Sequence, residues 1–375
     1  VHHCCSLLSC SKYLDVLLTM RKHKIDMNLL HDYDPRSFAE NVEKIVKEVN
    51  SSHLLSLFIA ALKEEDVTET MYKYVKDFVP MKQTQQRGEA NMSKVNFVCK
   101  LVRDAMEECH ETSFLSSIVL TFVRQNPPKV AEALRHLQDA GASIRSEGLE
   151  VLMGLVDPST VFDESLGLYD LDLAAAAAEQ GGRDPREYLP LLERLSALPD
   201  RLCCFEIDMM LKRRDSAMKH IILAGGEHWE RARELMLEHA LYEIALRVLK
   251  TQDRQKHLNE AYDLYASHLL DSGRYRDAAL AFRAADNLSS SLNALQQGGL
   301  WQPFFLLLHE TGAQPNEIQR RAYELAEGLR VTGQGKEAAR LFLDYCQDTD
   351  EAVSSLTEVG EWLQAARGGR SKTGG

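Results

Sequence analysis

The sequence predicts an all-α protein, an α-solenoid of stacked helical hairpins of the tetratricopeptide-like type. Two observations predict helices. Apolar residues recur at helical spacing along much of the chain, and no run of alternating β-branched residues lies between hairpin turns. A third observation predicts the stacking, because the second half of the chain contains a degenerate internal repeat.

The first clear helix is expected over residues 36–49. Asp34 is placed to cap this helix, and Pro35 to occupy its first turn, where a missing N–H costs nothing. The apolar residues form one continuous stripe along it, as the spacing of Phe38, Val42, Ile45, Val46 and Val49 shows.

Two further helices follow the same logic. Residues 95–109 carry apolar side chains on one face over four turns, and residues 173–179 are rich in alanine. The second of these should end at the glycine pair 181–182, which is a natural helix stop.

A second Asp-Pro helix start occurs at Asp184 and Pro185. Glu187 stands at the capping-box position, three residues after the cap. The expected apolar stripe of this helix consists of Tyr188, Leu191, Leu192 and Leu195.

The internal repeat is an aromatic residue followed three positions later by alanine. It occurs at Tyr242 with Ala245 and again at Tyr275 with Ala278, 33 residues later. We interpret the aromatic residue as the start of a helix and the alanines as positions of close helix packing. Units of roughly 34 residues are typical of hairpins that bury a core only by stacking.

Glycines and tryptophans repeat as well. The pairs Gly273 with Gly333, Gly299 with Gly360, and Trp301 with Trp362 recur at similar spacing. One helix is expected to end at each glycine. Trp229, Trp301 and Trp362 are expected to pack between helices rather than to stack on nucleic-acid bases.

Composition divides the chain into five parts. Residues 80–92 are polar and lack periodicity, breaks are expected at Asp157 and Pro199, and the last nine residues have no apolar face. We expect the N-terminal part of a helical solenoid over 1–80, a flexible loop over 81–94, middle hairpins over 95–200, tetratricopeptide-like repeats over 201–366 and a disordered tail over 367–375.

Charge and hydropathy exclude several classes of protein. The formal charge is −12, from 44 Lys and Arg against 56 Asp and Glu, which disfavours autonomous nucleic-acid binding. No apolar stretch reaches the roughly 18 residues that span a bilayer, so no membrane association is expected. The chain begins at Val1 without signal-peptide features, and we interpret it as part of a longer intracellular protein with reduced cysteines.

No sequence motif predicts catalysis. The phosphate-binding loop, the G-x-G-x-x-G pattern, H-E-x-x-H and the G-x-S-x-G elbow are all absent. Asp170 and Asp172 are expected to favour a helix start, and Asp208 and Asp215 have no identifiable partner. We therefore predict that the protein is not an enzyme, with no catalytic residue and no cofactor.

Metal ligands are not predicted either. The eight cysteines form no C-x-x-C pair, and the N-terminal group of His2, His3, Cys4, Cys5 and Cys10 fits no standard metal site. His220, His228 and His239 lack the i, i+4 spacing of a helical site, so they are expected to be solvated or at the edge of the core.

Two basic clusters are the candidate contacts for an RNA backbone or an acidic partner. A solvated helix face is the alternative for both, and neither has the interleaved aromatic residues of a single-strand binder. The clusters consist of Arg21, Lys22 and Lys24, with His23 between them, and of Lys212, Arg213 and Arg214.

Several segments resemble the Elongator subunit 1 family. They are Lys63-Glu-Glu-Asp-Val-Thr-Glu-Thr-Met-Tyr72, Ser165-Leu-Gly-Leu-Tyr-Asp-Leu-Asp-Leu173 and Arg183-Asp-Pro-Arg-Glu-Tyr-Leu-Pro-Leu-Leu192, followed in order by Phe205-Glu-Ile-Asp208, Leu211-Lys-Arg213 and residues 261–279. The resemblance runs from about Met20 to Trp362, except for residues 82–94 and the tail.

The resemblance implies a scaffold rather than an enzyme. Members of the family join two β-propellers, absent here, to an α-solenoid and a dimerising C-terminal region. Their complex modifies C5 of wobble uridines in tRNA, an early step towards carboxymethyl-type side chains, and the chemistry resides in another subunit with radical-SAM and acetyltransferase domains. The implied partners are that catalytic subunit, a propeller subunit and, through the complex, tRNA.

The resemblance also bears on assembly and location. The full-length protein is expected to form a homodimer in the cytoplasm and also the nucleus. The family's dimerisation surface and basic tRNA-contacting stretch lie mainly beyond Trp362, so this stretch is not expected to dimerise or to bind tRNA by itself. The alternative function is a solenoid scaffold of a vesicle-coat or intraflagellar-transport complex, and an enzyme ranks third.

Overall fold

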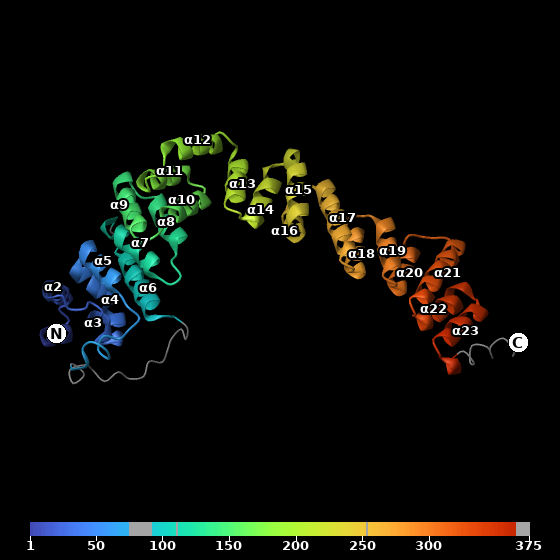
Figure 1. Ribbon diagram of the computed structural model, residues 1–375, viewed down its shortest axis with the longest axis horizontal. Coiled ribbons are helices and arrows are strands. Elements are labelled where there is room, and N and C mark those ends of the chain that lie inside the picture. The colour runs from blue at the N-terminus through green and yellow to red at the C-terminus, as the bar shows by residue number, and fades with distance from the viewer. Residues whose placement is uncertain (75–91, 110–111, 253, 365–375) are drawn as a thin grey trace. The chain divides into compact units, whose positions relative to one another are not determined.

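The computed structural model (Figure 1) describes residues 1–74, 92–109, 112–252 and 254–364. Within these ranges the chain forms helices joined by short turns, with no strand, which confirms the prediction of an all-α fold. Most of the predicted loop, residues 81–91, and the predicted tail, residues 367–375, lie outside the described residues. The chain divides into two compact units, residues 1–212 and 213–375.

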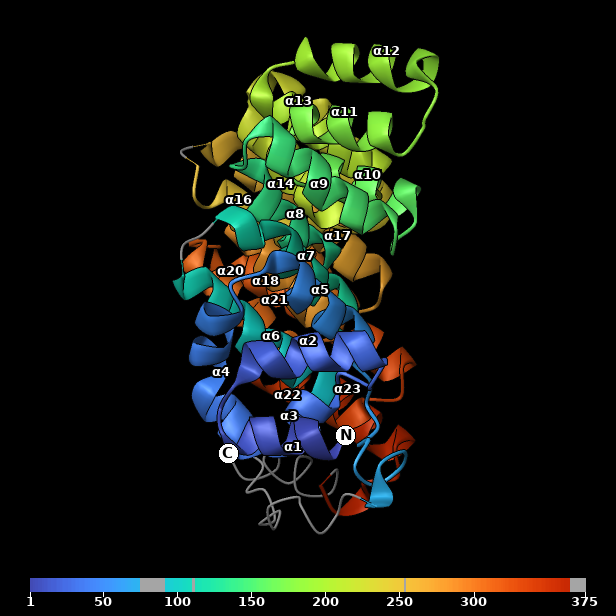
Figure 2. The same ribbon diagram turned by 90° about the vertical axis from the view of Figure 1, so that its left-hand side faces the viewer.

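Unit 1 is a stack of short helices, and Figure 2 shows them one above another from α1 to α12. Its elements are α1 (His2–Ser9), α2 (Tyr13–His23), α3 (Leu29–Asp32), α4 (Pro35–Val49), α5 (Ser52–Ala61), α6 (Lys94–Glu108), η2 (Thr112–Phe114), α7 (Leu115–Arg124), α8 (Val130–Gln138), α9 (Ala142–Met153), α10 (Pro158–Gly167), α11 (Leu171–Gln180), α12 (Pro185–Ser196) and α13 (Asp200–Met210).

Unit 2 consists of consecutive helical hairpins, of which α17 with α18 and α21 with α22 are clear examples in Figure 1. Its elements are α14 (Arg214–Ala224), η3 (Gly226–His228), α15 (Trp229–His239), α16 (Tyr242–Leu249), α17 (Gln255–Asp271), α18 (Tyr275–Ala284), α19 (Leu288–Gln297), α20 (Trp301–Glu310), α21 (Pro315–Val331), α22 (Gly335–Leu341), η4 (Phe342–Cys346, a π-helical turn) and α23 (Thr349–Glu358).

The Asp-Pro helix starts form as predicted. The Asp34 carboxylate accepts hydrogen bonds from the backbone N–H groups of Arg36 and Ser37, both at 3.2 Å, and Pro35 begins α4. Asp184 caps α12 in the same way. Each carboxylate satisfies donors that have no partner inside the helix and faces the positive end of the helix dipole.

Helices end in a recurring turn that uses the left-handed backbone conformation. After α17, Gly273 has φ +74°, and the N–H of Arg274 donates to the carbonyl of Leu269 at 2.9 Å. This is the Schellman arrangement, which favours glycine because its left-handed residue carries no Cβ. The predicted stops Gly299, Gly333 and Gly360 have φ values of +65°, +81° and +80°.

The repeat occupies the predicted positions in unit 2. Tyr242 and Tyr275 are the first residues of α16 and α18, and Ala245 and Ala278 are fully buried. Small side chains at these positions let neighbouring helices approach closely, and Ala278 belongs to an apolar core that extends from α17 to α23.

The tryptophans divide into two groups. Trp229 is 7% exposed, donates its indole N–H to Glu260 at 2.8 Å and stacks on His257, and Trp301 packs against the core of unit 2. The expectation for Trp362 was wrong, because this residue is 67% exposed. Its position as the start of a helix matches that of Trp301, but among the described residues no later helix covers it.

Candidate functional site

The first basic cluster lies at the end of α2. Arg21 and Lys22 belong to its last turn, and Lys24 follows with φ +53°; all three are exposed. Cations at this end of a helix face its negative pole, which gives them a structural role without any partner. A depression beside Lys22 is also lined by Asp15, so the surface there is not uniformly basic.

The second basic cluster lies at the turn between α13 and α14. Lys212 has φ +57°, Arg213 precedes α14 and Arg214 is its first residue. Lys212 and Arg214 are exposed, whereas Arg213 is half-buried.

The histidines and N-terminal cysteines do not converge on a metal site. Cys4 and Cys5 are buried in the core of unit 1. The Nε2 atom of His228 lies 3.8 Å from the carboxylate of Glu227, and that of His239 lies 3.7 Å from the carboxylate of Glu238. Across the described ranges, no group of three or more His, Cys, Asp or Glu residues is placed to hold a metal ion.

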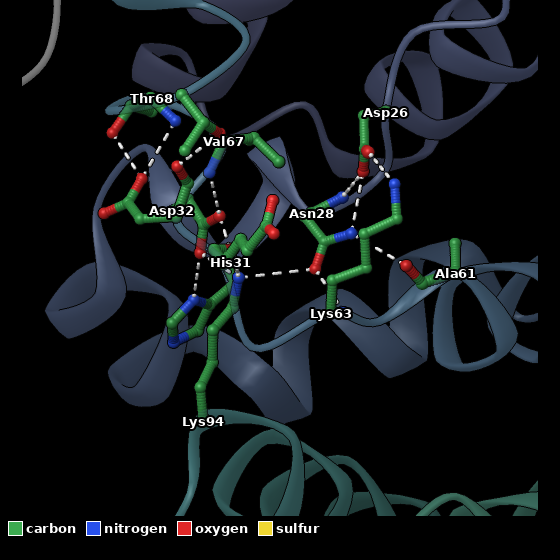
Figure 3. A network of polar contacts seen from close by, with 12 residues as sticks. Asp26, Asn28, His31, Asp32, Ala61, Lys63, Val67, Thr68 and Lys94 are labelled. Carbon is green, nitrogen blue, oxygen red and sulfur yellow. Dashed lines mark hydrogen bonds and ion pairs between the residues drawn. The ribbon is translucent and has the colours of Figure 1, made fainter.

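A buried polar network centred on Asp32 is a feature of unit 1 that sequence analysis did not predict. Figure 3 shows Lys94 extending from α6 towards the carboxylate of Asp32, which is 1% exposed. The Lys94 Nζ lies 2.8 Å from Asp32 Oδ1, and the Nδ1 atom of His31 lies 2.8 Å from the same oxygen. The N–H of Val67 donates to the other oxygen at 2.9 Å. The Lys94 ammonium, the His31 ring and the Val67 N–H therefore together compensate the buried carboxylate of Asp32.

Asn28 extends this network and is fully buried. Its amide donates to Asp26 at 2.7 Å and to the carbonyl of Ala61 at 2.8 Å. Its oxygen accepts from the N–H of Lys63 at 2.9 Å and from Lys94 at 3.3 Å. All the hydrogen-bonding capacity of the side chain is used inside the protein, as Figure 3 shows.

Asp26 lies at the edge of the network. Burial opposes ionisation of this carboxyl, but hydrogen bonds from Asn28 and Lys63 outweigh it, so the pKa of Asp26 lies below its usual value. Lys63 Nζ is 3.0 Å from the Asp26 carboxylate, and this bond raises the pKa of Lys63. Both groups are therefore ionised near neutral pH, and their ion pair joins the segment after α5 to the segment before α3.

The network explains the motif at residues 63–72. The backbone carbonyl of Glu65 accepts from Lys94 at 2.7 Å, Asp66 accepts from the N–H of Thr68 at 2.9 Å, and the Tyr72 hydroxyl accepts from the N–H of Asp26 at 2.9 Å. The motif is therefore joined to Asp26, just before α3, through Lys63 and Tyr72, and to the start of α6 through the backbone carbonyl of Glu65. Lys94 was predicted to end a flexible loop, but it begins α6 and is 14% exposed.

Two other motifs meet at Asp208. Sequence analysis identified no partner for this residue. It is fully buried in α13, and the Tyr169 hydroxyl donates to its carboxylate, 3.1 Å from each oxygen. Asp170, next to this tyrosine, caps α11 through the N–H of Leu173 at 2.8 Å, as predicted. Periodicity could not reveal the Tyr169–Asp208 contact, because it joins residues 39 positions apart.

A groove in unit 2 is a second feature that sequence analysis missed. It has a volume of about 500 Å³ and lies along α19 and α21 and the turns that follow them. Its lining is mixed and includes side-chain amides, glycines and two leucines. The lining residues are Asn293, Gln296, Gln297, Gly298, Gly299, Glu324, Leu325, Gly328, Leu329, Thr332 and Gln334. The only signal in the sequence was the run Gln296-Gln297-Gly298-Gly299.

The apolar helices of this chain are short. Within the parts that the structure describes, none combines the length and hydrophobicity needed to cross a bilayer.

Comparison with known proteins places both units in one family. The chain matches the family model described as the ELP1 alpha-solenoid over residues 1–195 and the one described as the ELP1 TPR domain over residues 203–367. It is 32% identical to Elongator complex protein 1 of Mus musculus and 31% identical to that of Arabidopsis thaliana, over 98% and 96% of this chain. Identity to the Saccharomyces cerevisiae protein is 30% over 92% of the chain.

The chain spans a little over a quarter of these relatives, 28% of the mouse and plant proteins and 27% of the yeast protein. The matched regions follow one another in the same order as the two compact units. The chain belongs to the Elongator complex protein 1 family and corresponds to its α-solenoid and TPR regions.

Proposed function

We propose that the protein is a non-catalytic scaffold subunit of Elongator, which supports modification of tRNA wobble uridines at C5. It holds the catalytic subunit, with its radical-SAM and acetyltransferase domains, beside the tRNA, together with a propeller subunit. The observation that carries this proposal is the match of both family regions, in order, over residues 1–195 and 203–367.

The use of the polar residues supports the same proposal. Asp34, Asp170 and Asp184 cap helices, and Asp32 and Asp208 accept hydrogen bonds from other parts of the chain. These carboxylates therefore make structural hydrogen bonds. Stacked hairpins present the extended surface that scaffold proteins use for binding. We place the protein in the cytoplasm and also the nucleus, and the full-length protein in a homodimer.

Affinity purification with mass spectrometry tests the scaffold role. The tagged protein, expressed in its own cells, should recover the catalytic and propeller subunits of Elongator. Disruption of the gene should deplete carboxymethyl-type wobble uridines in tRNA, and re-expression should restore them. Recovery of vesicle-coat or transport subunits with unchanged tRNA nucleosides would overturn the proposal.

The two basic clusters stay candidate contacts for tRNA within the complex. Replacement of Arg21, Lys22 and Lys24 by glutamine should weaken tRNA binding by the purified complex and reduce its salt dependence, because fewer phosphates are neutralised. The same change at Lys212, Arg213 and Arg214 tests the second cluster. The exposed Lys44 and Lys47 of α4 provide a matched control. Equal tRNA affinity for all variants would remove both clusters from the interface.

A further inference from the structure

The second basic cluster precedes a serine in a pattern that occurs once in the chain. Ser216 has Arg214 and Arg213 at the second and third positions before it, and Lys212 at the fourth. No other serine or threonine of the sequence has arginine at both of these positions. Basophilic serine/threonine protein kinases recognise this arrangement, R-R-x-S, because acidic side chains in their substrate cleft pair with the two guanidinium groups.

The fold leaves the hydroxyl of this serine available. Ser216 is the third residue of α14 and is half-buried, and its hydroxyl makes no hydrogen bond within the described residues. By contrast, the hydroxyl of Ser196, which has arginine only at the second position before it, donates to the carbonyl of Glu193 at 2.9 Å. Transfer of a phosphoryl group to Ser216 therefore breaks no hydrogen bond of the described structure.

The basic residues that a kinase would read lie at the edge of the helix. Lys212 has φ +57° in the turn after α13, Arg213 is the N-cap of α14, and Arg214 is its first residue. Because Lys212 and Arg214 are exposed, a kinase reaches their charges without any change in the fold.

The start of α14 is also poorly secured. No side chain caps this helix, whereas Asp34 and Asp184 cap α4 and α12. A helix end without a cap frays more readily, and helix ends open at lower free energy than the core. A kinase takes its substrate in an extended conformation, so the opening must reach Ala217, which is fully buried. The kinase would therefore act on a minor, locally open population.

We propose that Ser216 is a phosphorylation site, with ATP as the phosphoryl donor and a basophilic serine/threonine kinase as the enzyme. The Ser216 Oγ attacks the γ-phosphorus of MgATP, and the bond between that phosphorus and the β,γ-bridging oxygen breaks. ADP leaves, and the hydroxyl proton passes to the catalytic aspartate of the kinase. The phosphate adds a charge of about −2 beside Lys212, Arg213 and Arg214, and so cancels most of the positive charge of the second basic cluster. This inference does not depend on the proposed function.

The test incubates the purified, folded protein with MgATP and the catalytic subunit of cyclic-AMP-dependent protein kinase, a kinase of this class. Intact-mass and tandem mass spectrometry count and locate the phosphoryl groups. A synthetic peptide of residues 209–221 measures the same reaction without the fold. Ser216→Ala removes the acceptor, and the double variant Arg213→Gln, Arg214→Gln removes the recognised cations. The matched control is Arg186→Gln, Arg194→Gln, which removes the same charge from exposed positions of α12.

The folded protein should accept one phosphoryl group, at Ser216, and Ser216→Ala should abolish the reaction. Its kcat/KM should lie about tenfold to a hundredfold below that of the peptide, because only the open form reacts. Loss of Arg213 and Arg214 should lower kcat/KM about tenfold or more, whereas the α12 control should match the wild type. Thermal unfolding shows that each variant is folded.

Three results would overturn the inference. Phosphorylation of the peptide without phosphorylation of the folded protein would mean that the fold withholds Ser216. Incorporation that persists in Ser216→Ala would place the modification elsewhere. No reaction of either the protein or the peptide would mean that the R-R-x-S pattern is not recognised in this sequence.

Discussion

At the scale of single residues, unit 1 depends on a few buried or partly buried polar side chains. Lys94 donates to Asp32 and to the carbonyl of Glu65, and Asp32 is 1% exposed. The carboxylate and the ammonium compensate each other, and their side chains are 2% and 14% exposed, so loss of Lys94 leaves the Asp32 carboxylate charged and buried.

Lys94→Met should therefore destabilise the protein by about 3–5 kcal/mol, because it keeps the length of the side chain but leaves Asp32 without its cation. Denaturant unfolding followed by circular dichroism measures this loss. Lys47→Met is the matched control: Lys47 is 63% exposed, 3.6 Å from Glu43, and its loss should change stability by no more than about 0.5 kcal/mol. Similar effects of the two variants would show that His31 and the N–H of Val67 suffice for Asp32.

Tyr169 combines an unusual backbone with a hydrogen bond to a buried carboxylate. Its φ is +61°, which is unfavourable for an aromatic residue, and its hydroxyl donates to Asp208. Tyr169→Phe keeps the ring and removes the donor, and should cost about 1.5–3 kcal/mol because the acceptor is a buried carboxylate. Tyr188→Phe is the control in the same unit, since that hydroxyl makes no hydrogen bond within the described residues. Equal thermal stability of both variants would argue against a structural role for the Tyr169–Asp208 bond.

Cys99 shows how the core suppresses thiol chemistry. Burial raises its pKa to about 12, so the thiolate fraction at pH 8 is on the order of 10⁻⁴. Alkylation with iodoacetamide followed by mass spectrometry should modify the exposed Cys10 in the folded protein and Cys99 only after unfolding. Because the folded pKa exceeds the unfolded one, the contribution of Cys99 to stability is intact below about pH 8.5 and is lost as the pH rises towards 12. Rapid alkylation of native Cys99 would contradict its burial.

At the scale of elements, the turn between helices is the unit that repeats. Glycine occupies its left-handed position after α17, α19 and α21, but after α15 the same position is Ala240, with φ +54°. The Schellman bond still forms there, from the N–H of Leu241 to the carbonyl of Met236 at 3.1 Å. The turn therefore forms without glycine, and glycine only lowers the conformational strain of its left-handed residue.

Ala240→Gly should stabilise the protein by about 0.5–1 kcal/mol, because relief of the left-handed strain exceeds the added flexibility of the unfolded chain. The reciprocal change, Gly273→Ala, should cost about 1 kcal/mol, although its Cβ would meet no atom within 4 Å. Thermal unfolding measures both. Destabilisation by Ala240→Gly would mean that the turn needs the alanine side chain.

At the scale of the whole molecule, stability is assembled locally. The substantial helix contacts join elements close together in chain order, and the apolar clusters lie within single units, two of them in unit 1 and one over residues 266–356 of unit 2. Such an arrangement predicts that a destabilising substitution lowers the stability of its own helices and their neighbours and leaves distant helices unchanged.

Ala278→Glu should place a carboxylate at a fully buried position of α18 and cost several kcal/mol, with a loss confined to unit 2. Hydrogen exchange should show faster exchange in α17, α18 and α19 and unchanged protection in α4 to α7. Ala284→Glu, at an exposed position of the same helix, is the control and should have little effect. Loss of protection throughout unit 1 would contradict local assembly, and unchanged stability would contradict the packing of the repeat.

Sequence alone determined the features that depend on neighbouring residues. The caps at Asp34 and Asp184, the apolar stripe of residues 36–49 and the helix starts at Tyr242 and Tyr275 all follow from contacts within one or two turns. A helix closes its hydrogen bonds between residues four apart, so its signal is local and can be recognised directly.

Only the tertiary structure decided which distant polar groups meet. Lys94 and Asp32 are 62 positions apart, and Tyr169 and Asp208 are 39 apart. It also decided that Trp301 is packed and Trp362 exposed, although both begin a helix after the same glycine turn. The position of a side chain along its own helix is fixed by local spacing. Its partner depends on which hairpins stack beside it, and that depends on packing over the whole unit rather than on any local pattern.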